Sequence, residues 1–144
     1  AHAIGIAAPR VAILSAVETV EEKLPSTVDA AALCKMAERG QIVGGVLDGP
    51  LAFDNAVSPE AAAEKGLTSA VAGHADILVV PDLEAGNILV KQLSFMGGAD
   101  AAGVVMGCRV PVVLNSRADN LRSRLASCAV ARLLAEALTP TRPG

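Results

Sequence analysis

The segment "VPVVLNSRADNL", residues 110–121, holds the side chains of this chain best suited to chemistry on an anion. Ser116 and Asp119 have the spacing of a capping box, which by itself needs no function and predicts only the start of a helix. The same geometry would direct backbone N–H groups and the positive end of that helix toward a ligand, and Arg117 would add a forked cation beside them. With Asn115 before it, the segment is interpreted either as a helix cap or as a site for a phosphate or a developing oxyanion.

Two further polar segments, "DGPLAFDNA" and "PDLEAGN", follow predicted strands. The carboxyl ends of strands are where open α/β sheets bind ligands, so both segments are candidates for substrate binding. The candidate residues are Asp48, Gly49, Pro50, Asp82, Gly86, Asn87 and Lys91. The first three can equally form a turn. For the other four, a turn, a helix cap and a solvated lysine are the favoured interpretations, with ligand binding as the alternative.

The sequence lacks the residue patterns of zinc sites, of common nucleotide-binding sites and of Ser-His-Asp catalytic sites. His2 and His74 are the only histidines, and neither has the spacing to cysteines or carboxylates that zinc requires, so no metal site is predicted. No Walker loop and no G-x-G-x-x-G follows a predicted strand. A Ser-His-Asp triad has no G-x-S-x-G elbow to support it.

Strand-length apolar segments alternate with amphipathic segments, which predicts an α/β fold with helices on both faces of a sheet. The predicted strands are residues 11–16, 42–47, 76–81, 102–107 and 110–115. The predicted helices are residues 26–40, 58–66, 85–96 and 118–138. Ser26 and Asp29 are predicted to cap the first helix, and Gly40 to end it. Ser58 is the predicted N-cap of the second helix, with Pro59 at its first position. Arg122, Arg124 and Arg132 are expected to face solvent on the last predicted helix.

Composition places further limits. The chain has 144 residues, 52% of them hydrophobic, which is enough for one domain with an aliphatic core. A net charge of −3, with no Trp or Tyr, argues against nucleic-acid binding. Three cysteines without a C-x-x-C favour a reduced, cytoplasmic protein, and no segment resembles an export signal or a membrane span. Because the chain starts without Met, we expect it to be part of something longer.

Four segments in order, "PRVAILSAVE", "DGPLAFDNAVS", "VAGHADILVVPDLEAGN" and "PVVLNSRAD", resemble the phosphate acetyl/butyryltransferases. The resemblance covers nearly the whole chain and is strongest to the C-terminal half of the phosphotransacylase region of bifunctional enoyl-CoA hydratase/phosphate acetyltransferases. It implies the reaction acyl-CoA + phosphate = acyl phosphate + CoA, by direct attack of the CoA thiol in a ternary complex. It also implies a fold like that of isocitrate and isopropylmalate dehydrogenases, a homodimer or larger homo-oligomer, and no metal or redox cofactor.

Ser116 and Arg117 match the Ser-Arg pair of this family, which implies that Ser116 bonds the thiol or the oxyanion and that Arg117 holds the phosphoryl oxygens. The resemblance also implies that "PDLEAGN" lines or supports the cleft. Acetyl-type members have an Asp two helical turns beyond the Ser, where this chain has Ser123. The nearer acid is Asp119, so the identity of the base and of the acyl group stays open.

By the same resemblance, residues 1–109 would be the inserted α/β domain, residues 110–139 the last strand and helix of the other domain, and residues 140–144 a flexible tail. This is the C-terminal half of a family member, so the isolated chain would carry an incomplete site. Two alternatives remain. One is a non-catalytic scaffold that oligomerises, and the other is a metal- and NAD-dependent 2-hydroxyacid dehydrogenase of the same fold.

Overall fold

The computed structural model describes residues 1–139, which divide into two compact units. Unit 1 comprises Ala1 and Ile6–Gly86, and unit 2 comprises His2–Gly5 and the chain from Asn87 onward. The elements of unit 1 are β1 (Arg10–Leu14), α1 (Pro25–Glu38), β2 (Val46–Leu51), α2 (Phe53–Val57), α3 (Pro59–Glu64) and β3 (Ile77–Val79). Helix α4 (Leu83–Phe95) begins in unit 1 and continues into unit 2, which also contains the 3-10 helix η1 (His2–Ile4), β4 (Val104–Val105), β5 (Val112–Val113) and α5 (Leu121–Leu138). The predicted tail, residues 140–144, lies outside the described residues.

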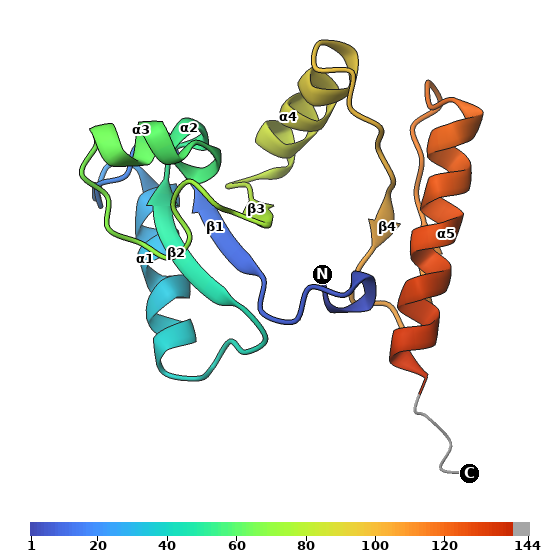
Figure 1. The fold of residues 1–144 in the computed structure, drawn as a ribbon, viewed down its shortest axis with the longest axis horizontal. Helices are drawn as coiled ribbons and strands as arrows, with labels where there is room; N and C mark the ends of the chain where they lie inside the picture. The colour runs from blue at the N-terminus through green and yellow to red at the C-terminus, as the bar shows by residue number, and fades with distance from the viewer. Residues whose placement is uncertain (140–144) are drawn as a thin grey trace. The chain divides into compact units, whose positions relative to one another are not determined.

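Unit 1 contains a parallel three-stranded sheet with the order β2-β1-β3 (Figure 1), which confirms the predicted α/β class. The central strand β1 is buried from Val11 to Leu14, as expected for a strand that is apolar on both faces. Helix α1 lies against one face of the sheet, where Ala30 packs with Val11 and Ile13. The partly buried side chains of Leu33, Cys34, Leu47 and Ile77 complete this core.

Arg10 and Asp76 tie the first residue of β1 to the residue before β3. The backbone N–H of Arg10 donates to Asp76 Oδ2 at 2.8 Å, and the backbone N–H of Asp76 donates to the Arg10 carbonyl at 2.8 Å. Their side chains form an ion pair at 3.0 Å as well. The amino ends of these two strands are therefore fixed by both backbone and side-chain bonds.

Strand β2 corrects the prediction for residues 42–47, because it begins only at Val46. Gly44 has a φ of +94°, a left-handed conformation that a strand does not accommodate. Asp48, Gly49 and Pro50 consequently lie inside β2 instead of following it. A Cβ on Gly49 would lie 2.7 Å from the carbonyl oxygen of Ile13, so only glycine lets the two strands approach this closely. The peptide bond between Gly49 and Pro50 is cis.

Helix α1 begins differently from the prediction and ends as predicted. Ser26 does not cap it, because Pro25 already occupies the first turn and Leu24 is the N-cap residue. No side chain caps the helix, and the buried Thr27 donates from its hydroxyl to the Leu24 carbonyl at 2.7 Å and accepts the backbone N–H of Glu21 at 2.9 Å. The helix ends before Gly40, whose φ of +71° is the predicted stop.

Helix α3 confirms its predicted cap. The hydroxyl of Ser58 accepts the backbone N–H of Ala61 at 3.2 Å, and Pro59 is the first helical residue. Gly66, with a φ of +66°, follows the end of the helix as predicted. The predicted helix at residues 85–96 is confirmed as α4.

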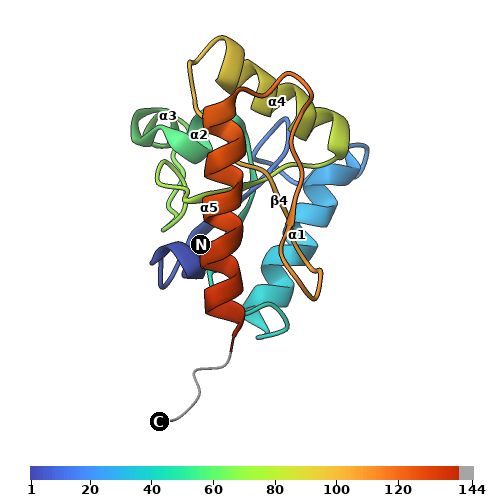
Figure 2. The same ribbon diagram turned by 90° about the vertical axis from the view of Figure 1, so that its right-hand side faces the viewer.

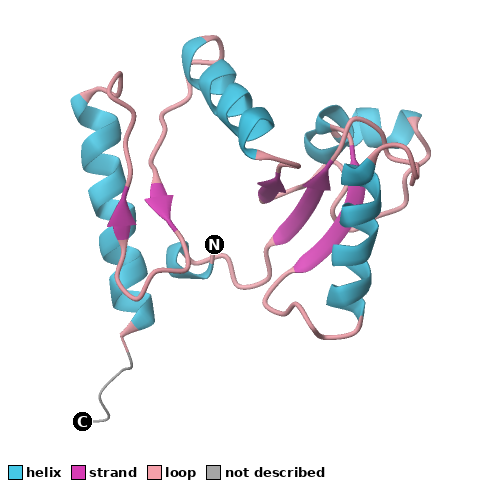
Figure 3. Cartoon of the chain, turned by 180° about the vertical axis from the view of Figure 1, so that it is seen from behind, coloured by secondary structure: helices cyan, strands magenta, loops and turns pink. Residues whose placement is uncertain are grey.

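In unit 2, β4 and β5 pair antiparallel with each other and form a sheet of their own, beside α5 in Figure 3. The apolar pattern predicts strands at residues 102–107 and 110–115 in a sheet with helices on both faces, and the family resemblance assigns the second of them to another domain. Both strands are shorter than predicted, with two residues each. The connection between them is too short for a crossover, so only a hairpin is possible.

Helix α5 is continuous from Leu121 to Leu138 (Figure 2). It starts later than the predicted Ala118, because Asn120 is the N-cap and its Oδ1 accepts the backbone N–H of Ser123 at 2.9 Å. Its buried residues are the small ones Ser123, Ser127 and Ala131. Over residues 1–139, no helix is both long enough and apolar enough to cross a membrane.

Candidate functional site

The predicted residues Asn115, Ser116 and Asp119 are brought together in a turn just before α5. The carboxylate Oδ2 of Asp119 accepts the backbone N–H of Ser116 at 2.8 Å and the Asn115 Nδ2 at 3.1 Å. The backbone N–H of Asp119 donates to the Ser116 carbonyl at 3.1 Å. This is the half of a capping box in which the acid bonds back to the first residue. The box closes a turn and not a helix, because α5 begins after it.

Arg117 is exposed, as are its neighbours Ser116 and Ala118 in this turn. Within residues 1–139 it forms no ion pair, whereas Arg122 pairs with Asp100 at 2.7 Å and Arg132 with Glu136 at 2.9 Å. The guanidinium of Arg117 is thus available to an anion. Arg122, Arg124 and Arg132 are exposed on α5, which confirms that they face solvent.

The predicted contribution of a helix end to this anion site needs correction. The segment was expected to start the helix at Ala118, but α5 starts at Leu121 and its first turn is capped by the side chain of Asn120. Arg117 and the turn therefore lie outside the first turn of the helix, where the helix dipole acts most strongly. The positive charge at this turn is therefore that of the Arg117 guanidinium.

Asp48, Gly49 and Pro50 form a tightly packed part of β2. The Asp48 Oδ1 accepts the backbone N–H of Gly49 at 2.9 Å, and Cys34 Sγ approaches the Gly49 carbonyl at 3.6 Å. Burial, together with the nearby carboxylates of Asp48 and Glu38, raises the pKa of the Cys34 thiol to about 11. The neighbouring thiol is consequently protonated at neutral pH.

The predicted residues around α4 divide into a cap and exposed side chains. Asp82 Oδ1 accepts the backbone N–H of Ala85 at 2.7 Å, which confirms the helix-cap interpretation. Gly86 lies against Val80, where an added Cβ would be 2.9 Å from Val80 Cγ2. Asn87 and Lys91 are exposed, and Lys91 has no ion pair within the described part of the chain.

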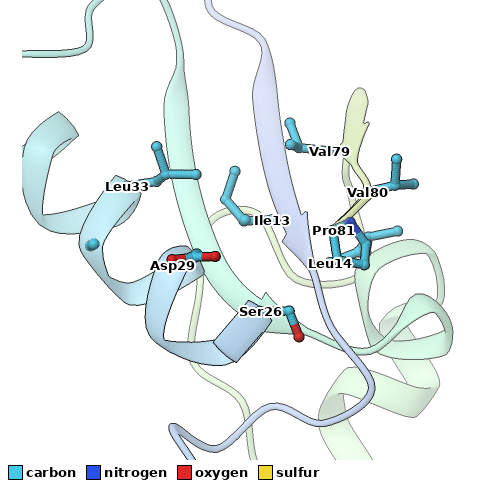
Figure 4. Close-up of a pocket in the computed structure, with 9 residues that line it drawn as sticks. Ile13, Leu14, Ser26, Asp29, Leu33, Val79, Val80 and Pro81 are labelled. Atoms are coloured by element: carbon cyan, nitrogen blue, oxygen red, sulfur yellow. The ribbon is translucent and has the colours of Figure 1, made fainter. Parts of the chain in front are cut away.

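A cavity of about 380 Å³ lies in unit 1 at the carboxyl ends of β1 and β3, beside the first turns of α1 (Figure 4). Its wall is mainly aliphatic, and its polar side chains are those of Ser26 and Asp29. The Ser26 hydroxyl is 2.8 Å from that of Ser15. This cavity was not predicted, because the spacing of Ser26 and Asp29 indicates only a helix cap. The position at the ends of parallel strands was the available signal.

A second polar cluster of unit 1, also missed, surrounds the fully buried Asn55. Its Nδ2 donates to Glu18 Oε2 at 3.3 Å, and Lys65 pairs with the same carboxylate oxygen at 2.9 Å. The bond from Lys65 lowers the pKa of Glu18. The Oδ1 of Asn55 has no hydrogen-bond partner among the residues that the structure describes.

The predicted residues thus fall into separate groups. Asp48, Gly49, Pro50, Asp82 and Gly86 belong to unit 1, whereas Asn87, Lys91 and the turn at residues 115–119 belong to unit 2. Within residues 1–139, no three His, Cys, Asp or Glu side chains are grouped so that they could hold a metal ion.

Known proteins similar to this chain agree on one family. A family model described as phosphate acetyl/butaryl transferase matches residues 1–132. A phosphate acetyltransferase of Rhizobium meliloti is 73% identical over 92% of this chain and 42% of its own length. A phosphate butyryltransferase of Clostridium acetobutylicum is 51% identical over 94% of this chain and 45% of its own length. The chain therefore spans less than half the length of these relatives.

A solved structure agrees with the sequence relatives. The branched-chain phosphotransacylase of Enterococcus faecalis V583 superposes with a TM-score of 0.82 and 38% sequence identity. The match covers 93% of this chain and 48% of that one.

Proposed function

The chain belongs to the phosphate acetyl/butyryltransferase family, and we propose that this protein moves an acetyl or short-chain acyl group between CoA and inorganic phosphate. The structural observation that supports the proposal most directly is the turn that presents Ser116 and Arg117. Asp119 holds this turn closed by accepting the Ser116 N–H at 2.8 Å, and the guanidinium of Arg117 is exposed beside it. An exposed guanidinium with unused donors suits a phosphoryl group, whose oxygens it can bind in pairs.

In the direction that forms acyl-CoA, the CoA sulfur attacks the carbonyl carbon of the acyl phosphate. The C–S bond forms, the bond between the carbonyl carbon and the phosphate oxygen breaks, and phosphate leaves. The Ser116 hydroxyl donates to the oxyanion that develops on the carbonyl, and Arg117 neutralises charge on the leaving phosphate. A thiol of ordinary pKa, about 8.5, is mostly protonated at neutral pH, so a base beside it speeds the attack.

We propose Asp119 as the residue that accepts the thiol proton. One of its oxygens, Oδ2, is fixed by the Ser116 N–H and the Asn115 amide. These bonds orient the carboxylate and leave Oδ1 to receive the proton. Acceptance as the C–S bond forms means that no free thiolate has to accumulate.

The remaining predicted residues are proposed to bind or shape the substrates. They are Asn115, Asp82, Gly86, Asn87, Lys91, Asp48, Gly49 and Pro50. Asp82 supports the start of α4, from which Asn87 and Lys91 extend as exposed side chains. Gly49 and Pro50 act through the close packing of β2 on β1.

The finer features of the family extend the proposal. We propose the fold of isocitrate and isopropylmalate dehydrogenases, with the domain boundary between residues 109 and 110. We further propose a cytoplasmic homodimer or larger homo-oligomer that uses CoA and phosphate without a metal or redox cofactor, and that binds neither nucleic acid nor membrane.

The experiment is phosphate-dependent release of free thiol from acetyl-CoA and from butyryl-CoA, measured with the intact protein and its Arg117→Ala variant. Arg124→Ala is the matched control, because it removes the same charge from an exposed position of α5. Turnover that is lost in Arg117→Ala and kept in Arg124→Ala supports the transferase and its anion site. No phosphate-dependent release from either substrate by the wild type would contradict the proposal and favour a scaffold.

A further inference from the structure

We propose that Ser127 of α5 is a positioning residue for the Ser116–Arg117 turn, an inference that rests on the proposed function. The side chain of Ser127 is fully buried. Its hydroxyl donates to the carbonyl of Ser123 at 2.8 Å and accepts the backbone N–H of Gly103 at 3.0 Å. It also accepts the Nδ2 of Asn115 at 3.0 Å. Ser127 thus joins α5, the residue before β4 and the first residue of the turn.

Asn115 carries this connection into the site. Its Nδ2 donates to Asp119 Oδ2 at 3.1 Å, and the same oxygen accepts the backbone N–H of Ser116 at 2.8 Å. Three hydrogen bonds in series therefore lead from a buried hydroxyl to the backbone of Ser116. The side chain of Ser127 is remote in sequence from the turn and has no place in the proposed chemistry, so its effect has to pass through Asn115 and Asp119.

The single proton of the Ser127 hydroxyl sets the direction of the series. Because that proton is donated to the Ser123 carbonyl, the hydroxyl can only accept from Asn115. The amide nitrogen of Asn115, and not its oxygen, must then face Ser127, which leaves the second N–H of the same nitrogen for Asp119. The amide plane is fixed at both N–H groups, and the carboxylate of Asp119 is fixed with it.

The turn depends on this anchor because its other hydrogen bonds are local. The backbone N–H of Ala118 approaches the Ser116 hydroxyl at 3.4 Å, and the backbone N–H of Asp119 donates to the Ser116 carbonyl at 3.1 Å. Both bonds move with the turn and do not tie it to a rigid element. Without the Ser127 hydroxyl, one N–H of Asn115 and the N–H of Gly103 lose their acceptor, and the amide is free to rotate. Ser116 and Asp119 are then no longer held in position to contact the substrates.

The test uses the intact protein with Ser127→Ala, Asn115→Leu and the double variant. Asn115→Leu has a similar shape and removes both N–H donors without adding a charge, so it breaks the bonds to Ser127 and Asp119 together. A misplaced turn should lower kcat of the thiol-release reaction about 10- to 100-fold, with little change in the KM for CoA. Because both variants cut the same series, the double variant should be no slower than the slower single one. Thr139→Ala is the control, since it removes a similar side-chain bond to a backbone carbonyl, Thr139 Oγ1 to Ala135 O, from the end of the same helix.

A second readout is independent of turnover. Deuterium uptake by a peptide covering residues 110–120 should be faster in Ser127→Ala than in the wild type, because the Ser116 N–H is less protected. Wild-type kcat in Ser127→Ala, multiplicative losses in the double variant, or unchanged uptake would each overturn the inference while leaving the transferase in place. If the wild type shows no turnover, the proposed function fails, and deuterium uptake alone decides the role of Ser127. If Ser127→Ala does not fold, Ser127→Cys, which keeps the shape and replaces the hydroxyl by a weak donor and acceptor, decides by the same two measurements.

Discussion

The guanidinium of Arg10 donates hydrogen bonds to both carboxylate oxygens of Asp76, with Nε 3.0 Å from Oδ2 and Nη2 3.1 Å from Oδ1. These side-chain bonds and the Arg10 backbone N–H lower the pKa of Asp76 to about 2. In the unfolded chain the same carboxylate titrates near its ordinary value of about 3.9. Protons therefore bind the unfolded state first as the pH falls, and the contribution to stability decreases from about pH 4 down to about pH 2.

Asp76→Asn should consequently lower Tm at pH 7 and should differ little from the wild type at pH 2. The measurement is Tm of the intact wild type and variant at pH 7, 4, 3 and 2. Glu84→Gln, at an exposed position of α4, controls for the loss of a negative charge. A Tm difference that stays constant down to pH 2 would show that Asp76 acts through packing and not through its ion pair.

Asp119→Asn and Asp119→Ala separate the two roles of that residue. Asparagine keeps an oxygen for the Ser116 N–H but accepts no proton, so kcat should fall by about 10²- to 10⁴-fold, the usual contribution of a general base. Alanine also releases the turn and should be slower still, with faster deuterium uptake over residues 110–120. Near-normal kcat in Asp119→Asn would mean that another group takes the thiol proton.

Arg117→Lys tests whether the fork of donors matters or only the charge. Lysine places one compact cation where the guanidinium offers paired N–H groups. We expect the KM for phosphate to rise about tenfold, the equivalent of one charged hydrogen bond at the low end of its range. The KM for CoA should be almost unaffected. Equal increases for both substrates would instead indicate a general disturbance of the turn.

Gly49→Ala and Gly66→Ala separate a steric clash from backbone strain. A Cβ at Gly49 would lie 2.7 Å from the backbone oxygen of Ile13, whereas one at Gly66 would meet nothing within 4 Å but would face a φ of +66°. Left-handed strain costs about 1–2 kcal/mol, and overpacking between two strands of the sheet costs about 1–3 kcal/mol and leaves the strands misaligned. Urea unfolding should therefore show the larger loss for Gly49→Ala, and a larger loss for Gly66→Ala would contradict the close approach of β2 to β1.

Cys34 should react slowly with thiol reagents. With a pKa of about 11, far less of it is thiolate at neutral pH than for an ordinary cysteine. Iodoacetamide labelling of the intact protein, located by peptide mass spectrometry, should show a Cys34 rate that still rises above pH 9. A rate that levels off below pH 9 would contradict the effect of burial and of the Asp48 carboxylate.

Some helix ends were predictable from local signals, but the S-x-x-D patterns at Ser26 and Ser116 did not mark the start of a helix, and strand limits were not predictable. Gly40 ends α1 because its backbone can adopt a positive φ. Ser58 starts α3 because its side-chain oxygen accepts a backbone N–H of the first turn. Both effects are local. The extent of β2 depends on how Gly44 turns and on how Gly49 packs against Ile13, a contact between distant residues. Alternation of apolar residues cannot report such a contact.

The turn shows the same limit at the candidate site. The S-x-x-D spacing correctly indicated a bond between Ser116 and Asp119. It placed that bond at a helix end because the competing N-cap, Asn120, was not recognised. The role of Ser127 was out of reach, since a serine inside an amphipathic helix gives no sign of which backbone and amide groups it meets.

The order β2-β1-β3 has a consequence for how the chain acquires its fold. β1 and β2 are joined through α1, so residues 10–51 form a strand–helix–strand segment whose contacts are comparatively local. β3 pairs with β1 across a larger separation in sequence, 66 residues between Arg10 and Asp76, and this span includes α1, β2, α2 and α3. Loop-closure entropy grows with that separation, and non-local pairings form slowly. The segment from β1 to β2 should thus be the nucleus, and the docking of β3 with its ion pair the final step of folding in unit 1.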